Sequence, residues 1–114
     1  MILEHGRWKV PIENSDKHRK MMREIYANIR SNPERFSHIR SSRFYTFRSK
    51  ENSRFETWIY LDEYQDQDSY DRMSKTLTED KRAAELRARW ETLIVPSSFK
   101  VEVWTDFASE LWLG

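Results

Sequence analysis

Residues 54–64 and 99–107 alternate between apolar and polar residues, residues 42–48 are rich in Phe, Tyr and Thr, and two longer segments carry apolar residues three and four positions apart. Alternation with a period of two is typical of a β-strand, whereas the wider spacing forms one face of a helix. The pattern predicts strands at residues 2–10, 42–48, 54–64 and 99–107, and helices over residues 15–31 and 65–94. The order of these elements is β-α-β-β-α-β.

Short polar residues mark where the helices begin. Asn14 or Ser15 can cap the first helix by accepting a hydrogen bond from its first turn. The second helical region is expected in two pieces, one capped by Asp68 or Ser69 and the other by Thr78. The chain should therefore contain three helical pieces.

This element order predicts an α+β fold of the ferredoxin-like kind, an antiparallel four-stranded sheet with its helices on one face. The 114 residues are expected to form a single domain, 1–114. Both faces of the sheet carry apolar residues. The helix-facing side is expected to take Phe55, Ile59, Leu61, Phe99, Val101 and Val103, and the opposite side Trp58, Tyr60 and Trp104.

Aromatic residues make up 14% of the sequence, which exceeds what one small core readily hides and favours an oligomer or a lined cavity. Cysteine is absent, so disulfides, thiolate catalysis and cysteine-bound zinc are excluded. The first segment reaches a charge at Glu4, and no apolar run approaches the length of a membrane span. A cytoplasmic protein without a signal peptide or membrane span is expected.

The charges are unevenly distributed. Residues 1–54 contain 13 basic and 6 acidic side chains, whereas residues 55–114 contain 7 basic and 13 acidic ones. A basic patch for an anionic partner is one interpretation. The net charge of only +1 favours the other, in which basic and acidic elements lie side by side or meet across a dimer.

Several short patterns resemble the dimeric α+β barrel proteins, in particular their NIPSNAP-like and antibiotic-biosynthesis-monooxygenase-like branches. They are the opening segment 4–10, the run Leu61-Asp62-Glu63-Tyr64, then Tyr70, Leu77, Asp80 and Trp90, and finally Val101-Glu102-Val103-Trp104. The resemblance implies a homodimer whose two sheets pack face to face and close a barrel. It also implies a cavity, either between the sheets or between each sheet and its helices. Activities of such proteins include cofactor-free oxygenation, haem degradation, isomerisation and cyclisation, and some members have no known reaction.

His5 is the candidate acid or base. If its side of the first strand faces the barrel, His5 shares that face with Glu56, Tyr60 and Glu102, and an imidazole beside a carboxylate can move a proton near neutral pH. The alternative is that His5 fills a polar dimer interface. The residues expected to line the cavity or interface are Arg7, Tyr45, Trp58 and Trp104.

No metal or cofactor is expected. The haem-degrading branch takes its iron ligand from a histidine in the second helical region, and residues 65–94 contain none. Haem would have to use His5, His18 or His38. The aspartates of residues 62–71 lack the glycine and glutamate that a calcium loop needs, and the dispersed histidines form no zinc motif.

Three functions remain open. The first is the binding of an apolar or aromatic small molecule in a sheet-lined cavity, by a metal-free monooxygenase, isomerase or cyclase. The second is a non-catalytic binding or structural homodimer of the same fold. The third is an RNA-binding module of the RRM kind, since Phe44, Tyr45, Phe47, Trp58 and Tyr60 lie on the central strands. The segment 54–58 has no glycine and contains an acidic residue, which disfavours nucleic acid.

Overall fold

The computed structural model of the chain describes residues 1–51, 53–106, 111 and 113. Its strands are β1 (Ile2–Pro11), β2 (Ile39–Phe47), β3 (Phe55–Tyr64) and β4 (Lys100–Thr105). Its helices are α1 (Ser15–Ser31), α2 (Gln67–Glu79) and α3 (Lys81–Glu91), with short 3-10 turns η1 (Ile12–Asn14) and η2 (Pro96–Ser98). The predicted element order is confirmed. Phe107, expected at the end of the last strand, lies outside the described residues.

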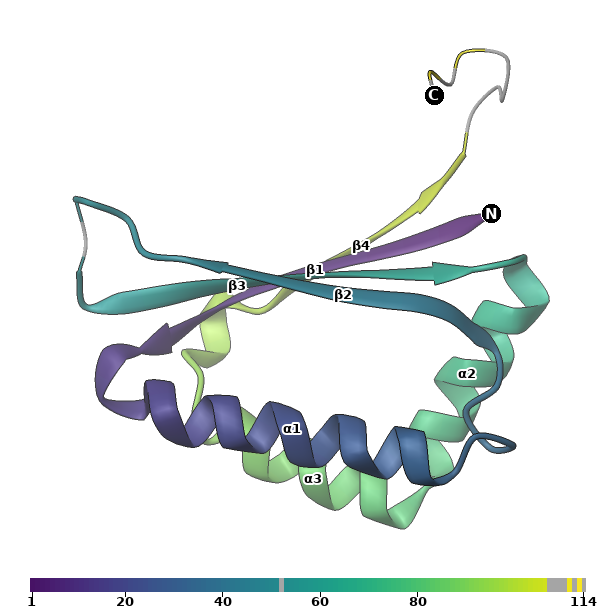
Figure 1. The fold of residues 1–114 in the computed structure, drawn as a ribbon, viewed down its shortest axis with the longest axis horizontal. Helices are drawn as coiled ribbons and strands as arrows, with labels where there is room; N and C mark the ends of the chain where they lie inside the picture. Colours follow the sequence, from purple (N-terminus) through teal and green to yellow (C-terminus); the bar gives the residue numbers. More distant parts are fainter. Residues whose placement is uncertain (52, 107–110, 112, 114) are drawn as a thin grey trace.

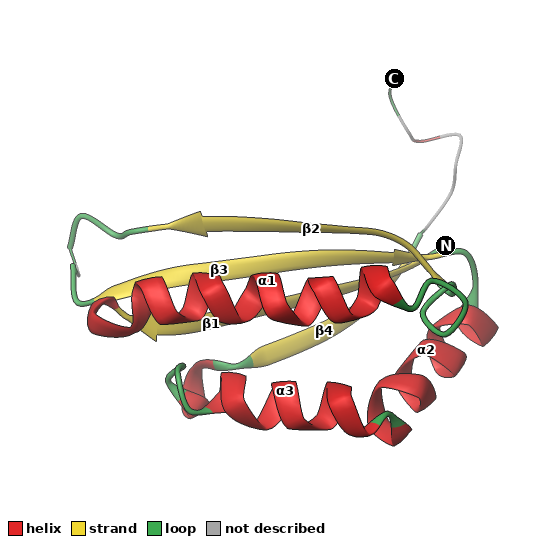
Figure 2. Ribbon diagram, turned by 60° about the horizontal axis from the view of Figure 1, so that its bottom comes forward, coloured by secondary structure: helices red, strands yellow, loops and turns green. Residues whose placement is uncertain are grey.

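The four strands form one antiparallel sheet in the order β2-β3-β1-β4. The helices α1 and α3 run beneath one face of this sheet, and α2 descends from the end of β3 to join them (Figure 1). Figure 2 shows the same two layers, with the helices α1, α2 and α3 on one side of the sheet. The predicted ferredoxin-like α+β fold is confirmed. In the described part of the chain, no helix is long and apolar enough to cross a bilayer.

The helix caps differ from the predicted ones by two residues. Asp66 and Asp80 have extended backbones, and each side chain accepts a hydrogen bond of 2.8 Å from the backbone N–H three residues later. The expected caps Asp68 and Thr78 lie inside α2, and Ser69 is the donor to Asp66. A cap must lie just before the first helical residue, where an extended backbone lets the side chain turn back onto the helix.

The face assignment of β3 was wrong. Trp8 lies opposite Trp58 and Gly6 lies opposite Tyr60 in the β1–β3 register, so these residues share one face. That face is the one covered by helices, because Trp8 is in contact with Trp90 of α3. The apolar residues predicted to face the helices, Phe55, Ile59 and Leu61, lie on the open face instead. Period-two alternation separates two faces but does not say which one is buried when both carry large apolar groups.

The face assignment of β4 was correct. Phe99, just before β4, packs against Trp8 and Trp90, with ring centroids 6.2 and 5.2 Å apart. Val101 and Val103 lie on the same face but stay 42% and 46% exposed on this edge strand. Trp104 lies on the open face, as predicted.

The core has two parts between sheet and helices. One contains Trp8, Val10, Met21, Trp58, Leu86, Trp90 and Ile94, and the other contains Ile2, Phe36, Tyr64 and Met73. Each is a cluster of buried side chains, and a cavity is lined by residues of both clusters. This cavity positions the candidate site.

Candidate functional site

A cavity of about 210 Å³ lies between the sheet and the helices, lined by residues of both core clusters. Its apolar walls include Trp8, Met22, Ile25, Phe44, Trp90 and Phe99, and its polar groups include Glu4, Tyr26, Tyr60, Asp62 and Tyr64. A mostly apolar hollow with a few converging polar groups is the usual form of a small-molecule site. A second hollow, between α1 and α3, is lined mainly by charged side chains such as Lys17, Glu24 and Arg89 and offers no such combination.

Two carboxyl groups lie side by side in the cavity wall. Glu4 of β1 and Asp62 of β3 are directly opposite each other in the sheet. The Tyr60 hydroxyl donates to one oxygen of Glu4 at 3.0 Å, and the Tyr70 hydroxyl donates to the other at 2.9 Å. Both oxygens of Glu4 are therefore satisfied by phenols.

Asp62 is held differently. Its Oδ1 accepts a hydrogen bond of 2.5 Å from Ser42 of β2, and Ser42 in turn lies 3.0 Å from the hydroxyl of Tyr26. Asp62 is only 8% exposed, and its Oδ2 has no partner among the described residues. One carboxylate oxygen thus remains available to a ligand in the cavity.

The close approach of the sheet backbone at Gly6 makes this arrangement possible. A Cβ atom built on Gly6 would lie 1.9 Å from Cε1 of Tyr60. The Tyr60 ring therefore lies across the glycine and reaches Glu4, two residues along β1. Any side chain at this position would displace the ring.

Burial controls the ionisation of the cavity groups. It raises the pKa of the Asp62 carboxyl to about 6, and the neighbouring Glu4 acts in the same direction while the bond from Ser42 opposes it. Burial also raises the pKa of Tyr26, Tyr60 and Tyr64 above the ordinary range, so these phenols remain protonated donors. A carboxyl that titrates near pH 6 can accept or return a proton at physiological pH.

A second polar cluster lies deeper, around His18 of α1, which is completely buried. Its Nε2 accepts hydrogen bonds from the indole N–H groups of Trp8 at 2.9 Å and Trp90 at 3.1 Å. A nitrogen that accepts twice carries no proton, so the imidazole proton is assigned to Nδ1, which has no partner. Burial lowers the pKa of His18 to about 4 and keeps the ring neutral.

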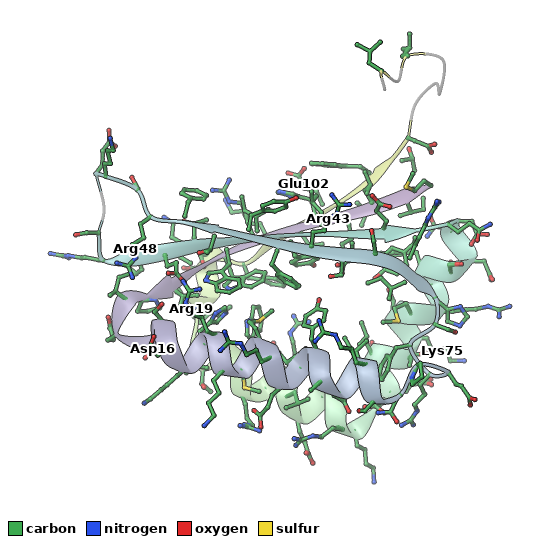
Figure 3. The ribbon with its side chains drawn as sticks, in the orientation of Figure 1. Asp16, Arg19, Arg43, Arg48, Lys75 and Glu102 are labelled. Atoms are coloured by element: carbon green, nitrogen blue, oxygen red, sulfur yellow. The ribbon has the colours of Figure 1, made fainter. Side chains whose placement is uncertain are left out.

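Glu56 forms the third polar group of the helix-facing side. It accepts from the Trp58 indole at 2.6 Å and from Arg19 of α1 at 2.8 Å. Arg19 points from α1 toward the sheet (Figure 3), and its guanidinium lies 5.5 Å from the Trp58 ring. Although burial opposes ionisation, these hydrogen bonds hold the pKa of Glu56 below its ordinary value. The ion pair between Arg19 and Glu56 joins the basic half of the chain to the acidic half. A second ion pair, in which a guanidinium nitrogen of Arg35 lies 2.7 Å from Asp80, does the same.

The four residues predicted to share one face lie on two faces. His5 is opposite Leu61 and Glu102 on the open face, whereas Glu56 and Tyr60 face the helices. The His5 ring stacks on Trp104 with centroids 5.0 Å apart. The predicted grouping of His5 with Tyr60 was therefore wrong, because it depended on the parity of β3.

The predicted lining residues are divided in the same way. Arg7, Tyr45 and Trp104 lie on the open face, while Trp58 is buried under α1. Figure 3 shows Arg43 and Glu102 on the same open side. Trp58 and Tyr60, which RNA stacking would require on the open face, are turned to the helices.

Sequence reasoning missed Glu4, Asp62, Tyr26 and Ser42. The available signal was the alternation of Glu56, Trp58, Tyr60, Asp62 and Tyr64, in which carboxyl groups alternate with large aromatic rings. No histidine lines the cavity, so its residues offer no imidazole to haem. In the described part of the chain, no three His, Cys, Asp or Glu side chains gather as a metal site would need.

Several solved structures share this fold. A NIPSNAP domain protein from Burkholderia xenovorans has a TM-score of 0.71 at 12% identity, covering 96% of this chain and 97% of that one. An antibiotic biosynthesis monooxygenase has a TM-score of 0.66 at 12% identity, and the match covers 95% of this chain and 100% of that one. SnoaB, a cofactor-independent oxygenase from Streptomyces nogalater, has a TM-score of 0.56 at 10% identity, and the match covers 97% of each chain.

The expected resemblance to NIPSNAP and antibiotic-biosynthesis-monooxygenase-like proteins is confirmed at the level of the fold. No family model matches the sequence, and no curated protein matches it at a significant level. At such low identity the likeness shows the fold alone, and one fold hosts many functions. The function must therefore be argued from the cavity.

Proposed function

We propose that this protein binds a small apolar or aromatic molecule between its sheet and its helices and performs metal-free acid–base chemistry on it. Monooxygenase, isomerase and cyclase reactions without a metal can all begin with removal of a proton from the substrate. The proposal depends on one observation, the buried Asp62, which lines an aromatic cavity and has no hydrogen bond at Oδ2 among the described residues. The fold neighbours named as an antibiotic biosynthesis monooxygenase and a cofactor-independent oxygenase support it.

Cavity size limits the ligand. An apolar cavity of roughly 150 Å³ accommodates benzene. The cavity of about 210 Å³ in this protein therefore suits one aromatic ring with a short substituent. Within it, Asp62 would act as the base, and Tyr60 and Tyr26 would remain proton donors. Of the four residues predicted to be catalytic, Tyr60 is the one that the proposal keeps in the site.

The binding test uses two neighbouring alanines of α3. Ala83 lines the cavity, whereas Ala84 is exposed on the helix surface. We expect Ala83→Leu to occupy the ligand space and to weaken binding of 2-phenylethanol at least tenfold, measured by tryptophan fluorescence and by calorimetry. Ala84→Leu should bind as the parent does. A parent chain that binds no small aromatic molecule, charged or neutral, would refute the proposed function.

We also propose that the protein is a homodimer formed through the open face of the sheet. Tyr45, Phe47 and Trp104 of this face are 51%, 47% and 43% exposed, and Ile59 and Leu61 lie between them. Large apolar side chains exposed on one sheet face favour a partner. In the dimer, His5 would lie at the interface beside Trp104, which agrees with the second interpretation of this histidine.

The dimer predicts a defined effect at Trp104. Trp104→Glu would bury a charge in the interface and should weaken association by about 2–4 kcal/mol. Sedimentation should show a dimer for the parent and a monomer or aggregate for the variant. Thr105→Glu, on the other face of β4, is the control and should remain dimeric. A parent chain that is monomeric at high concentration would contradict the proposal.

A non-catalytic homodimer of the same fold is the second candidate. It is favoured by the separation of His5 from Tyr60, since no histidine reaches the cavity. It predicts ligand binding without turnover, or a dimer that binds none of the aromatic probes. The ligand titration with Ala83→Leu distinguishes a dimer that binds no aromatic probe from the first proposal.

A further inference from the structure

The cavity contains two carboxyl groups that have no ion-pair partner among the described residues. Glu4 and Asp62 are adjacent in the sheet, and neither forms an ion pair with a described residue. The basic side chain among the lining residues is Arg87, whose Nε lies 3.0 Å from Glu91. Its guanidinium lies over Phe99, 5.2 Å from the ring centroid. The acidic end of the cavity therefore has no cation of its own.

Two adjacent carboxyl groups without a cation are costly. Asp62 is buried and loses hydration, Glu4 is half-buried, and their charges repel. The phenols of Tyr60 and Tyr70 satisfy Glu4 as hydrogen-bond donors but contribute no positive charge. Asp62 has only the neutral Ser42 as its partner. The missing component of this site is a positive charge.

The walls around these carboxyl groups are aromatic. Tyr26, Phe44, Tyr60 and Tyr64 all line the same cavity, and Phe44 and Tyr60 are neighbours with centroids 6.2 Å apart. The face of an aromatic ring carries negative potential and attracts cations, most strongly where water is excluded. Carboxylates and ring faces together provide the environment that an ammonium group prefers.

We infer that the cavity selects a small monoamine in its protonated form, with the ammonium group at Asp62 and Glu4 and an apolar or aromatic body against Trp8 and Trp90. This inference rests on the proposed function, because it names the ligand class of the same cavity. Asp62 supplies its free Oδ2 as the hydrogen-bond acceptor. Glu4 adds charge, while its two oxygens remain bound to tyrosines.

Two other occupants fit less well. A metal ion would need more oxygen ligands than this pair supplies, and no group of three metal-binding side chains exists among the described residues. An anionic ligand would be repelled by both carboxylates. It would fit better at the adjoining hollow lined by Arg19, Arg23 and Arg30.

The test compares three ligands that share one phenyl group and differ in charge. They are 2-phenylethylamine, 2-phenylethanol and 3-phenylpropionate. Each is titrated into the 114-residue chain at pH 7.5 by calorimetry, with the chemical shifts of the Trp8 and Trp90 indoles as a second reading. We expect the amine to bind about tenfold more tightly than the alcohol, and the acid most weakly.

Two isosteric variants locate the charge effect. Asp62→Asn should remove most of the preference for the amine over the alcohol. Glu63→Gln changes the next carboxylate along β3, which points to the open face, and should retain the preference. Glu4→Gln provides an independent loss of charge if Asp62→Asn fails to fold.

Each outcome decides between the claims. If the parent binds alcohol and amine equally, or binds the acid most tightly, the ligand class is wrong but the cavity function stands. If none of the three ligands binds, both proposals are overturned. An amine preference that survives both Asp62→Asn and Glu4→Gln would place the cation elsewhere and overturn the inference.

Discussion

Replacing His18 with alanine is expected to destabilise the protein by about 4–5 kcal/mol. The imidazole is fully buried, and its Nε2 is the acceptor for the indoles of Trp8 and Trp90. The substitution leaves both N–H groups without a partner and opens a cavity in the main core cluster. Each unsatisfied buried donor costs about 1–3 kcal/mol, and the lost packing adds to that cost.

Urea unfolding followed by tryptophan fluorescence measures this effect. His38 is the matched control, since it lies partly exposed in the turn before β2, and His38→Ala should change the free energy of unfolding by less than about 0.5 kcal/mol. If His18→Ala does not fold, His18→Gln keeps an acceptor and should show a smaller loss. A variant with parental stability would show that the two indole bonds contribute little.

Replacing Asp62 with asparagine should, in contrast to His18→Ala, stabilise the protein at pH 7, by about 1–3 kcal/mol. Burial raises the pKa of Asp62 from 3.8 to about 6, so ionising this group at neutral pH costs the native state free energy. Asparagine fills the same space, can accept the bond from Ser42, and carries no charge. A residue that lowers stability in this way is typical of a functional site.

The pH dependence gives this prediction a second measurement. Because the native state binds the Asp62 proton more tightly than the unfolded chain does, the cost of Asp62 develops as pH rises from about 4 to about 6. His18 acts oppositely. Its lowered pKa means that its contribution is complete above 6.5 and is lost as pH falls toward 4. In the parent these two effects largely offset each other.

Asp62→Asn should therefore expose the effect of His18 alone. Between pH 7 and 4.5 the variant should lose about 2–3 kcal/mol, while the parent changes much less. Thermal or urea unfolding at several pH values measures the difference, and Glu63→Gln should follow the parental curve. Equal pH dependence in parent and Asp62→Asn would mean that Asp62 is not buried as a charged group.

The sequence by itself determined the elements and their order. Alternation together with aromatic and β-branched composition predicted the four strands, and helical spacing predicted α1 and the two pieces of the second helical region. These segments leave few arrangements other than a ferredoxin-like sheet. Local signals were sufficient because each depends on residues close together in the chain. The caps were displaced by two residues, since Asp66 and Asp68 carry the same side chain and only the backbone distinguishes them.

Only the tertiary structure decided which face of β3 is buried, and with it the location of the site. Both faces carry large apolar side chains, so hydrophobicity alone could not choose between Ile59 and Tyr60. The choice depends on long-range partners: Glu56 accepts a hydrogen bond from Arg19 of α1, and Glu4 accepts one from Tyr60 across the glycine of β1. Buried N–H and O–H groups need such acceptors. The pairing of Glu4 with Asp62 joins residues 58 positions apart in sequence, and for that reason the acidic end of the cavity became visible only in the folded chain.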